Sequence, residues 1–137
     1  MAKTIPFRLI TPSQIAFEGD AELVIGVGTE GEEGILAEHA PFLTALRPGI
    51  LRAVVLADGA MKRIEFATSE GFMQALPDRV TVLVDAALRR EAIDLDATRR
   101  ELAEALERQK SAAVQSPEYG REQALIDFAN AKLALGA

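Results

Sequence analysis

The sequence predicts a β-sandwich or β-barrel domain followed by an antiparallel two-helix hairpin. Short β-prone runs separated by turn residues fill the first 87 residues, as in all-β domains. Beyond residue 88 the chain is rich in Ala, Leu, Glu and Arg, which are good helix formers. We therefore expect a sheet domain over 1–87 and a helical domain over 88–137, joined near Ala87–Glu91.

The strands are expected on either side of clear turn signals. Asp58-Gly59 lies between two β-prone runs, which is typical of a β-hairpin, and Pro77-Asp78-Arg79 marks a second one. The run Val80–Val84 is partly alternating and mostly β-branched, as a half-buried strand should be. The expected strands are 7–11, 22–27, 51–56, 61–67, 72–76 and 80–84.

The two helices have recognisable starts. Asp94 is a suitable N-cap, and Ser116-Pro117-Glu118 combines an N-cap, a proline at the first helical position and an acid near the positive end of the helix dipole. The expected buried stripes are Leu95, Leu102, Leu106 and Ala113 on the first helix, and Leu125, Phe128, Ala131 and Leu135 on the second. Both stripes are narrow and rich in alanine, so we expect a marginal hairpin that can dock in more than one place.

Composition excludes several classes of function. The chain has no cysteine and one histidine, so disulfides and zinc sites are not expected. A net charge of -6 and the absence of tryptophan do not fit a nucleic-acid binder. No apolar run reaches the roughly 18 residues of a membrane span, and the start lacks the apolar stretch of a signal peptide. A soluble, cytoplasmic chain is expected, or one that is peripheral on a cytoplasm-facing assembly.

The segment Gly26–Gly31 matches the G-x-G-x-x-G dinucleotide pattern, but no helix is expected to follow it. We therefore predict a loop built from glycines with positive φ. No phosphate-binding G-x-x-x-x-G-K-[ST] motif and no G-x-S-x-G turn are present, so His39 is expected to have a structural or contact role. An acidic cluster surrounds the loop and is expected to be a docking surface rather than a metal site; it comprises Glu30, Glu32, Glu33 and Glu38.

One long segment carries a family resemblance. Gly34–Leu51 reads GILAEHAPFLTALRPGIL and is similar to the G-I-L-P-G-H-A-P-L-L-T-A-L-x-P-G hallmark of the epsilon subunits of F-type ATP synthases. The segments Leu9–Pro12, Ser69–Phe72 and Val80–Ala87 resemble the family's V-T-P, G-G-F and V-T-V-L-A-D-x-A segments in the same order. The chain departs from the family at Ala37-Glu38, where Pro-Gly is usual.

The resemblance implies a non-catalytic rotor subunit of a proton-translocating ATP synthase. It implies a sandwich of about ten strands that packs on the gamma subunit and sits on the ring of c subunits. Family positions near the ring map onto Glu32 and His39. The expected location is the cytoplasmic face of the bacterial inner membrane, as a peripheral part of the complex.

The resemblance also implies that the helical hairpin is regulatory. Folded on the sandwich it leaves rotation free, and extended into the alpha/beta catalytic head it blocks ATP hydrolysis. Basic residues of the first helix could then meet acidic segments of the head; they are Arg99, Arg100, Arg108 and Lys110. The alternative is that these residues are solvated and pair locally with Glu101, Glu104 and Glu107.

Some family members bind ATP without hydrolysing it, through [IL]-D-x-x-R-A and two arginines on the second helix. Leu95-Asp96-Ala97-Thr98-Arg99 fits the first part, so Asp96 and Arg99 are the candidate ligands. Arg100 replaces the alanine, and the arginine positions fall on Phe128 and Lys132. The sequence therefore argues against ATP sensing, and we expect no cofactor.

Two other functions remain open at the level of sequence. One is a stand-alone small-molecule binding module in which the hairpin closes the mouth of the sandwich. The other is an enzyme that uses the acidic cluster as paired carboxylates, although no apolar pocket is evident that would separate their pKa values. Co-purification with gamma distinguishes the rotor subunit from both.

Overall fold

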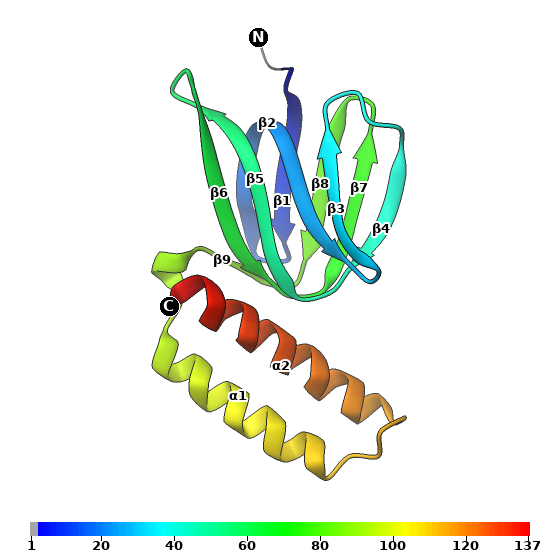
Figure 1. The fold of residues 1–137 in the computed structure, drawn as a ribbon, viewed down its shortest axis with the longest axis vertical. Helices are drawn as coiled ribbons and strands as arrows, with labels where there is room; N and C mark the ends of the chain where they lie inside the picture. Colours follow the sequence, from blue (N-terminus) through cyan, green and yellow to red (C-terminus); the bar gives the residue numbers. More distant parts are fainter. Residues whose placement is uncertain (1–2) are drawn as a thin grey trace.

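The computed structural model describes residues 3–137, which form a two-layered β-sandwich with a helical hairpin across one end (Figure 1). The strands are β1 (Ile5–Thr11), β2 (Gln14–Gly28), β3 (Gly31–Leu36), β4 (Phe42–Leu46), β5 (Gly49–Ala57), β6 (Ala60–Thr68), β7 (Gly71–Leu76), β8 (Arg79–Val84) and β9 (Ala87–Leu88). A 3-10 turn, η1 (Arg90–Ala92), leads into α1 (Leu95–Lys110) and α2 (Pro117–Gly136). The resemblance implied about ten strands, and residues 3–137 contain nine.

The long strand β2 belongs to both layers. Its first half pairs with β1, which continues through β8 and β7 to β4. Its second half pairs with β3 on one side and β5 on the other, and β5 continues to β6 and β9. The pairing of β1 with β8 is parallel, while the other pairings are antiparallel. Because β2 passes from one layer to the other, the two sheets close around a single core.

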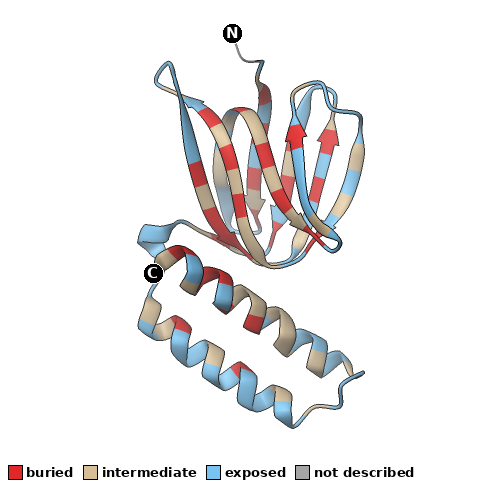
Figure 2. Ribbon diagram, in the orientation of Figure 1, coloured by how far each residue is buried: buried red, intermediate tan, exposed pale blue. Residues whose placement is uncertain are grey.

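Buried residues alternate with more exposed ones along the strands (Figure 2). The buried side chains form one core between the layers. From β1, β7 and β8 come Phe7, Leu9, Met73, Val80 and Val82, all fully buried. The facing layer contributes Val24, Ile35, Leu51, Val55 and Phe66. This continuous apolar core is the main stabilising element of the chain.

Both predicted hairpins are confirmed, but the sequence missed β3, β4, β9 and the first half of β2. The predicted glycine loop over residues 26–31 is also too long, because only residues 29 and 30 lie between β2 and β3. Gly26 and Gly28 lie inside β2, and of the glycines in that segment only Gly31 has a positive φ, at 130°. Glycine suits position 26 of this strand because a Cβ there would lie 3.0 Å from Leu46 Cδ2 and 3.1 Å from Met73 Cε. The glycine therefore allows close packing rather than a special turn.

The predicted helix starts are confirmed by their capping bonds. The Asp94 carboxylate accepts a 3.0 Å hydrogen bond from the backbone N–H of Ala97. The Ser116 hydroxyl accepts one of 3.2 Å from the N–H of Tyr119, and Pro117 opens α2. These bonds satisfy backbone donors that each helix start leaves free.

The predicted buried stripes are partly wrong. On α1, Leu106 is 44% exposed and Ala113 lies beyond the helix, whereas Thr98 and Ala105 are buried. On α2, Leu125 is 49% exposed. The buried residues of α2 are Ile126, Ala129, Ala131, Lys132 and Leu135. The buried residues of α1 are thus the small Thr98 and Ala105, while Leu106 and Leu125 are turned outward.

The second helix attaches the hairpin to the sandwich, and α1 lies on its far side (Figure 1). Ala131 and Leu135 pack with Ala67 of β6 in a small apolar cluster that also includes Ile50 and Phe128. The Arg90 side chain donates a 2.7 Å hydrogen bond to the carbonyl of Leu135. None of the helices in residues 3–137 is long and apolar enough to cross a membrane.

We predict that Gly71→Ala destabilises the sandwich strongly. A Cβ at this position would lie 1.9 Å from the carbonyl oxygen of Leu83, so β7 and β8 must separate. The free energy of unfolding should fall by about 3 kcal/mol, measured by urea denaturation. Gly120→Ala is the matched control, because an added Cβ at this position in the first turn of α2 meets nothing within 4 Å, and it should stabilise the chain by up to about 1 kcal/mol. Equal effects of the two substitutions would contradict the packing around Gly71.

Candidate functional site

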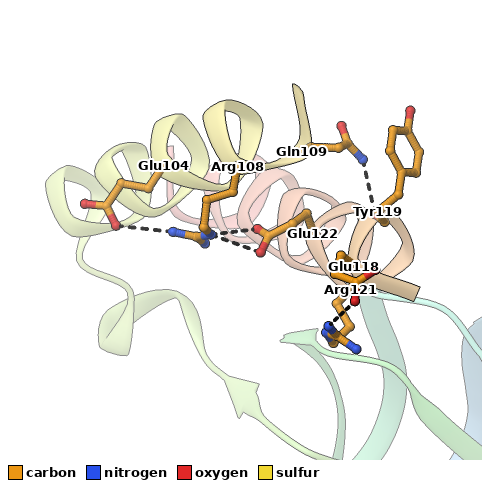
Figure 3. Close-up of polar contacts among 7 residues, drawn as sticks. All are labelled: Glu104, Arg108, Gln109, Glu118, Tyr119, Arg121 and Glu122. Atoms are coloured by element: carbon orange, nitrogen blue, oxygen red, sulfur yellow. Dashed lines mark hydrogen bonds and ion pairs between the residues drawn. The ribbon is translucent and has the colours of Figure 1, made fainter. Parts of the chain in front are cut away.

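Polar contacts join the two helices near the hairpin loop (Figure 3). Arg108 Nε of α1 donates to both carboxylate oxygens of Glu122 of α2, at 2.9 and 3.0 Å, and Arg108 Nη1 lies 3.9 Å from Glu104. The hydrogen bond to Glu122 is the main reason that the pKa of the Arg108 guanidinium is raised. Beside it, Gln109 donates to Gln123 at 2.9 Å. The end of the hairpin is thus fixed by directional bonds rather than by apolar packing.

Another interhelical pair lies toward the joint with the sandwich. Lys132 Nζ of α2 donates a 2.7 Å hydrogen bond to Glu101 of α1 and lies 4.6 Å from the centre of the Phe128 ring. Lys132 is only 8% exposed, while the Glu101 side chain is 56% exposed. A nearly buried ammonium requires a partner, so Glu101 compensates a charge that would otherwise be costly.

The predicted residues of α1 mostly bond within their own helix. Asp96 and Arg99 form an exposed 3.1 Å pair with each other, and Lys110 lies 3.4 Å from Glu107. Arg100 is exposed on the same helix. Two of the expected local pairs, Arg108–Glu104 and Lys110–Glu107, are present, but Glu101 bonds to α2.

The remaining candidates for nucleotide contact are engaged in packing. Phe128 packs against the apolar cluster beneath the sandwich, and Lys132 bonds to Glu101 rather than to Asp96. The structure therefore does not join these positions into one charged site.

Glu32 lies near the start of β3, whereas His39 lies beyond its end. Leu36 is four positions after Glu32, a span of roughly 13 Å along the strand, and His39 follows in the loop to β4. Glu32 pairs with Arg52 and lines a surface groove with Asp127 and Asn130 of α2. The exposed His39 ring lies 5.4 Å from the Phe42 ring, and Nδ1 is 2.8 Å from the carbonyl oxygen of Ala40. The two residues therefore do not form one compact cluster.

Within that loop, Glu38 has a φ of 67°, in the left-handed region. Its carboxylate pairs with Lys3 at 2.9 Å, and both side chains are about 70% exposed. The acidic cluster predicted from the sequence is thus divided between the two ends of β3. Among residues 3–137, no group of three or more Asp, Glu or His side chains is arranged to hold a metal ion.

An apolar row crosses the outer face of the sheet formed by β4, β7, β8 and β1. The strand register places its members side by side in the order Ala45, Phe72, Leu83, Ile10 and Ile15. Phe72 is 55% exposed, Leu83 50% and Ile15 48%. The neighbouring row is mostly polar and contains the Arg8–Glu18 pair at 3.0 Å. A contiguous exposed apolar surface of this kind is typical of a protein–protein interface.

The family model for the β-sandwich domain of the ATP synthase delta/epsilon chain matches residues 4–90. The chain belongs to this family. A relative from Magnetococcus marinus, an ATP synthase epsilon chain, is 34% identical over 134 residues, which cover 98% of this chain and 95% of the relative. Another ATP synthase epsilon chain, from Desulfosudis oleivorans, is 42% identical over 95 residues, which cover 69% of each chain.

Solved structures agree with the fold of this epsilon-family chain. A chain of the Euglena gracilis mitochondrial ATP synthase matches with a TM-score of 0.75 at 23% identity, covering 96% of this chain and 80% of that one. A chain of the Tetrahymena thermophila mitochondrial ATP synthase central stalk and c-ring has a TM-score of 0.66 at 16% identity, covering 95% of this chain and 97% of that one. The predicted fold class, a β-sandwich followed by two helices, is confirmed.

Sequence reasoning missed the apolar row and the interhelical bonds of this epsilon-family chain. One signal for the row was present, since Phe72-Met73 and Val82-Leu83-Val84 are apolar on both faces of their strands. The interhelical bonds had no such signal, because Glu101 and Lys132 are 31 residues apart.

We predict that Glu101→Gln loosens the hairpin, because it removes the charge that compensates the nearly buried Lys132. The free energy of unfolding should fall by about 1–2 kcal/mol, measured by thermal melting at 222 nm. Glu107→Gln is the control, because it breaks only the exposed pair with Lys110 and should change stability by less than about 0.5 kcal/mol. Equal stabilities for the two variants would contradict the role assigned to Glu101.

Proposed function

We propose that the chain is the epsilon subunit of a proton-translocating F-type ATP synthase, a non-catalytic component of the central stalk that couples the c-ring to gamma and restrains ATP hydrolysis. The apolar row is the observation that carries this proposal, because a rotor component needs a surface that another protein covers permanently. Membership of the delta/epsilon family favours this role over a small-molecule binding module or an enzyme. The complex would hold the chain at the cytoplasmic face of a bacterial inner membrane.

The apolar row is assigned to the gamma subunit. Phe72 and Leu83 lie at its centre, and each exposes about half of its surface. Large side chains at the centre of an interface supply most of its affinity, whereas polar rims supply little. A contact that transmits torque must be stable, and this surface places exposed apolar residues in one continuous row across the sheet.

The edge of β3 is assigned to the c-ring. Within residues 3–137, β3 pairs only with β2, so one backbone edge is unpaired, and acidic side chains occur along it. Since Glu32 lies near the start of this strand and His39 lies just past its end, a ring surface that contacts both must extend along the edge for roughly 13 Å. The polar loops of a ring could provide such an extended contact.

The hairpin is assigned to regulation. The hairpin reaches the sandwich mainly through α2, whose apolar contact there involves only a small cluster with three buried members, Ala67, Ala131 and Leu135. A weakly held element can be shifted between two positions by a modest difference in binding energy. Arg99, Arg100 and Lys110 are exposed and thus accessible to an acidic surface of the alpha/beta head, whereas Arg108 must first leave Glu122.

We predict that Phe72→Glu abolishes tight binding to gamma, because it places a charge at the centre of the apolar row. The dissociation constant, measured by biolayer interferometry, should rise about 30-fold or more. Leu56→Glu is the matched control, because Leu56 is a similarly exposed apolar residue, at 44%, on β5 of the other sheet. The affinity of Leu56→Glu for gamma should stay within about twofold of that of the parent chain. If Phe72→Glu binds gamma like the parent chain, the assignment of the row to gamma is wrong.

We also predict that a chain ending after Ala92 still assembles but regulates differently. This truncation retains β9 and the Arg89–Phe66 contact, and the sandwich core lies wholly before the cut. In reconstitution with gamma and the catalytic head, the rate of ATP hydrolysis should rise on the order of twofold or more relative to the full chain. Equal rates for the truncated and the full chain would contradict a regulatory role of the hairpin. Loss of assembly would contradict the assignment of assembly to the sandwich and of regulation to the helices.

A further inference from the structure

A groove of about 850 Å³ lies between the sandwich and the first half of α2. Its sandwich side includes Ile10, Phe72 and Leu83, and its helix side includes Gly120 and Ala124. The apolar cluster beneath the sandwich involves the second half of α2, from Phe128 onward. The groove is therefore the place where the helix and the sheet diverge.

We propose that the gamma surface that covers the apolar row also enters this groove and contacts α2, so that gamma binding and hairpin docking stabilise each other. The proposal rests on the assignment of the apolar row to gamma. It adds a second part to that interface. This second part exists only while the hairpin lies on the sandwich.

The groove and the row form one continuous surface. Ala45, Phe72, Leu83 and Ile10 belong to the row and also line the groove. A partner that covers Phe72 and Leu83 is thus already at the mouth of the groove. On the helix side, a Cβ added to Gly120 would meet nothing within 4 Å, and Ala124 is small. Space therefore exists for side chains of the partner next to α2.

The charges around the groove define the chemistry of the entering side chains. Three acidic residues line it, Glu70, Asp85 and Asp127, against one basic residue, Arg47. None of the three acids takes part in an ion pair within residues 3–137. Asp127 accepts a 2.9 Å hydrogen bond from Gln123. The occupant should be an apolar segment of gamma that carries a lysine or arginine.

Coupling follows from the two-sided construction of the groove. When α2 leaves the sandwich, the groove loses its helix wall and Asp127, and gamma loses those contacts. Linkage requires the reverse as well, so bound gamma must favour the docked hairpin by the same factor. Gamma would then act on the hairpin through direct contact, without any change in the core of the sandwich.

The test compares two substitutions in the full chain, Ala124→Arg and Ala134→Arg. The first places a cation in the groove, where it opposes a basic partner segment, and the second places the same side chain on an exposed position of the same helix. We expect Ala124→Arg to weaken gamma binding about tenfold and Ala134→Arg to change it less than about twofold. Far-ultraviolet circular dichroism of both variants checks that the helices are retained.

Hydrogen exchange on the unmodified chain provides an independent measurement. Saturating gamma should slow the exchange of backbone amides over residues 120–127, as well as those of the row strands β7 and β8. Parent-like binding by Ala124→Arg, or unchanged exchange over 120–127, overturns the proposed groove contact. The Phe72→Glu result separates the two claims: if that variant fails to bind while Ala124→Arg binds normally, gamma occupies the row but not the groove.

Discussion

The arrangement of the chain depends on the burial of α2 on two sides. On one side Ala131 and Leu135 pack beneath the sandwich. On the other, the buried Ile126 and Ala129 lie between Glu122 and Lys132, which both bond to α1. The first helix lies beyond α2, so its place relative to the sandwich is fixed through its partner (Figure 1). A single helix therefore determines whether the hairpin stays on the body of the protein.

The forces at the two sides of α2 differ in kind. Small side chains such as Ala67 and Ala131 bury little apolar area, so the contact with the sandwich is weak compared with the continuous core between the sheets. Between the helices, Arg108–Glu122 and Lys132–Glu101 fix the orientation, although partly exposed ion pairs contribute little net free energy. The sandwich is thus the stable part and the hairpin the adjustable part, as the proposed coupling and regulatory roles require.

The features that could be predicted from the sequence are those with local causes. The Asp94 and Ser116 caps and the Asp58-Gly59 turn act within a few residues, so they were identified correctly. Gly26 was misassigned because its role is to accommodate Leu46 and Met73, which are distant in sequence. For the same reason the pairing of Lys132 with Glu101 could not be foreseen. Tertiary contacts decided each of these positions.

Two places where the sequence departs from a one-faced pattern share an explanation. A helix or strand with one solvent-exposed face should show a single apolar stripe. Instead, α2 is apolar on several sides, and β8 contains Val82-Leu83-Val84 without alternation. For α2 the second cover is α1, within the same chain. For Leu83 and Phe72, no element of residues 3–137 covers the outer face, and both stay about half exposed. The same physical reasoning that accounts for the helix pair supports the proposed cover from another chain at the apolar row.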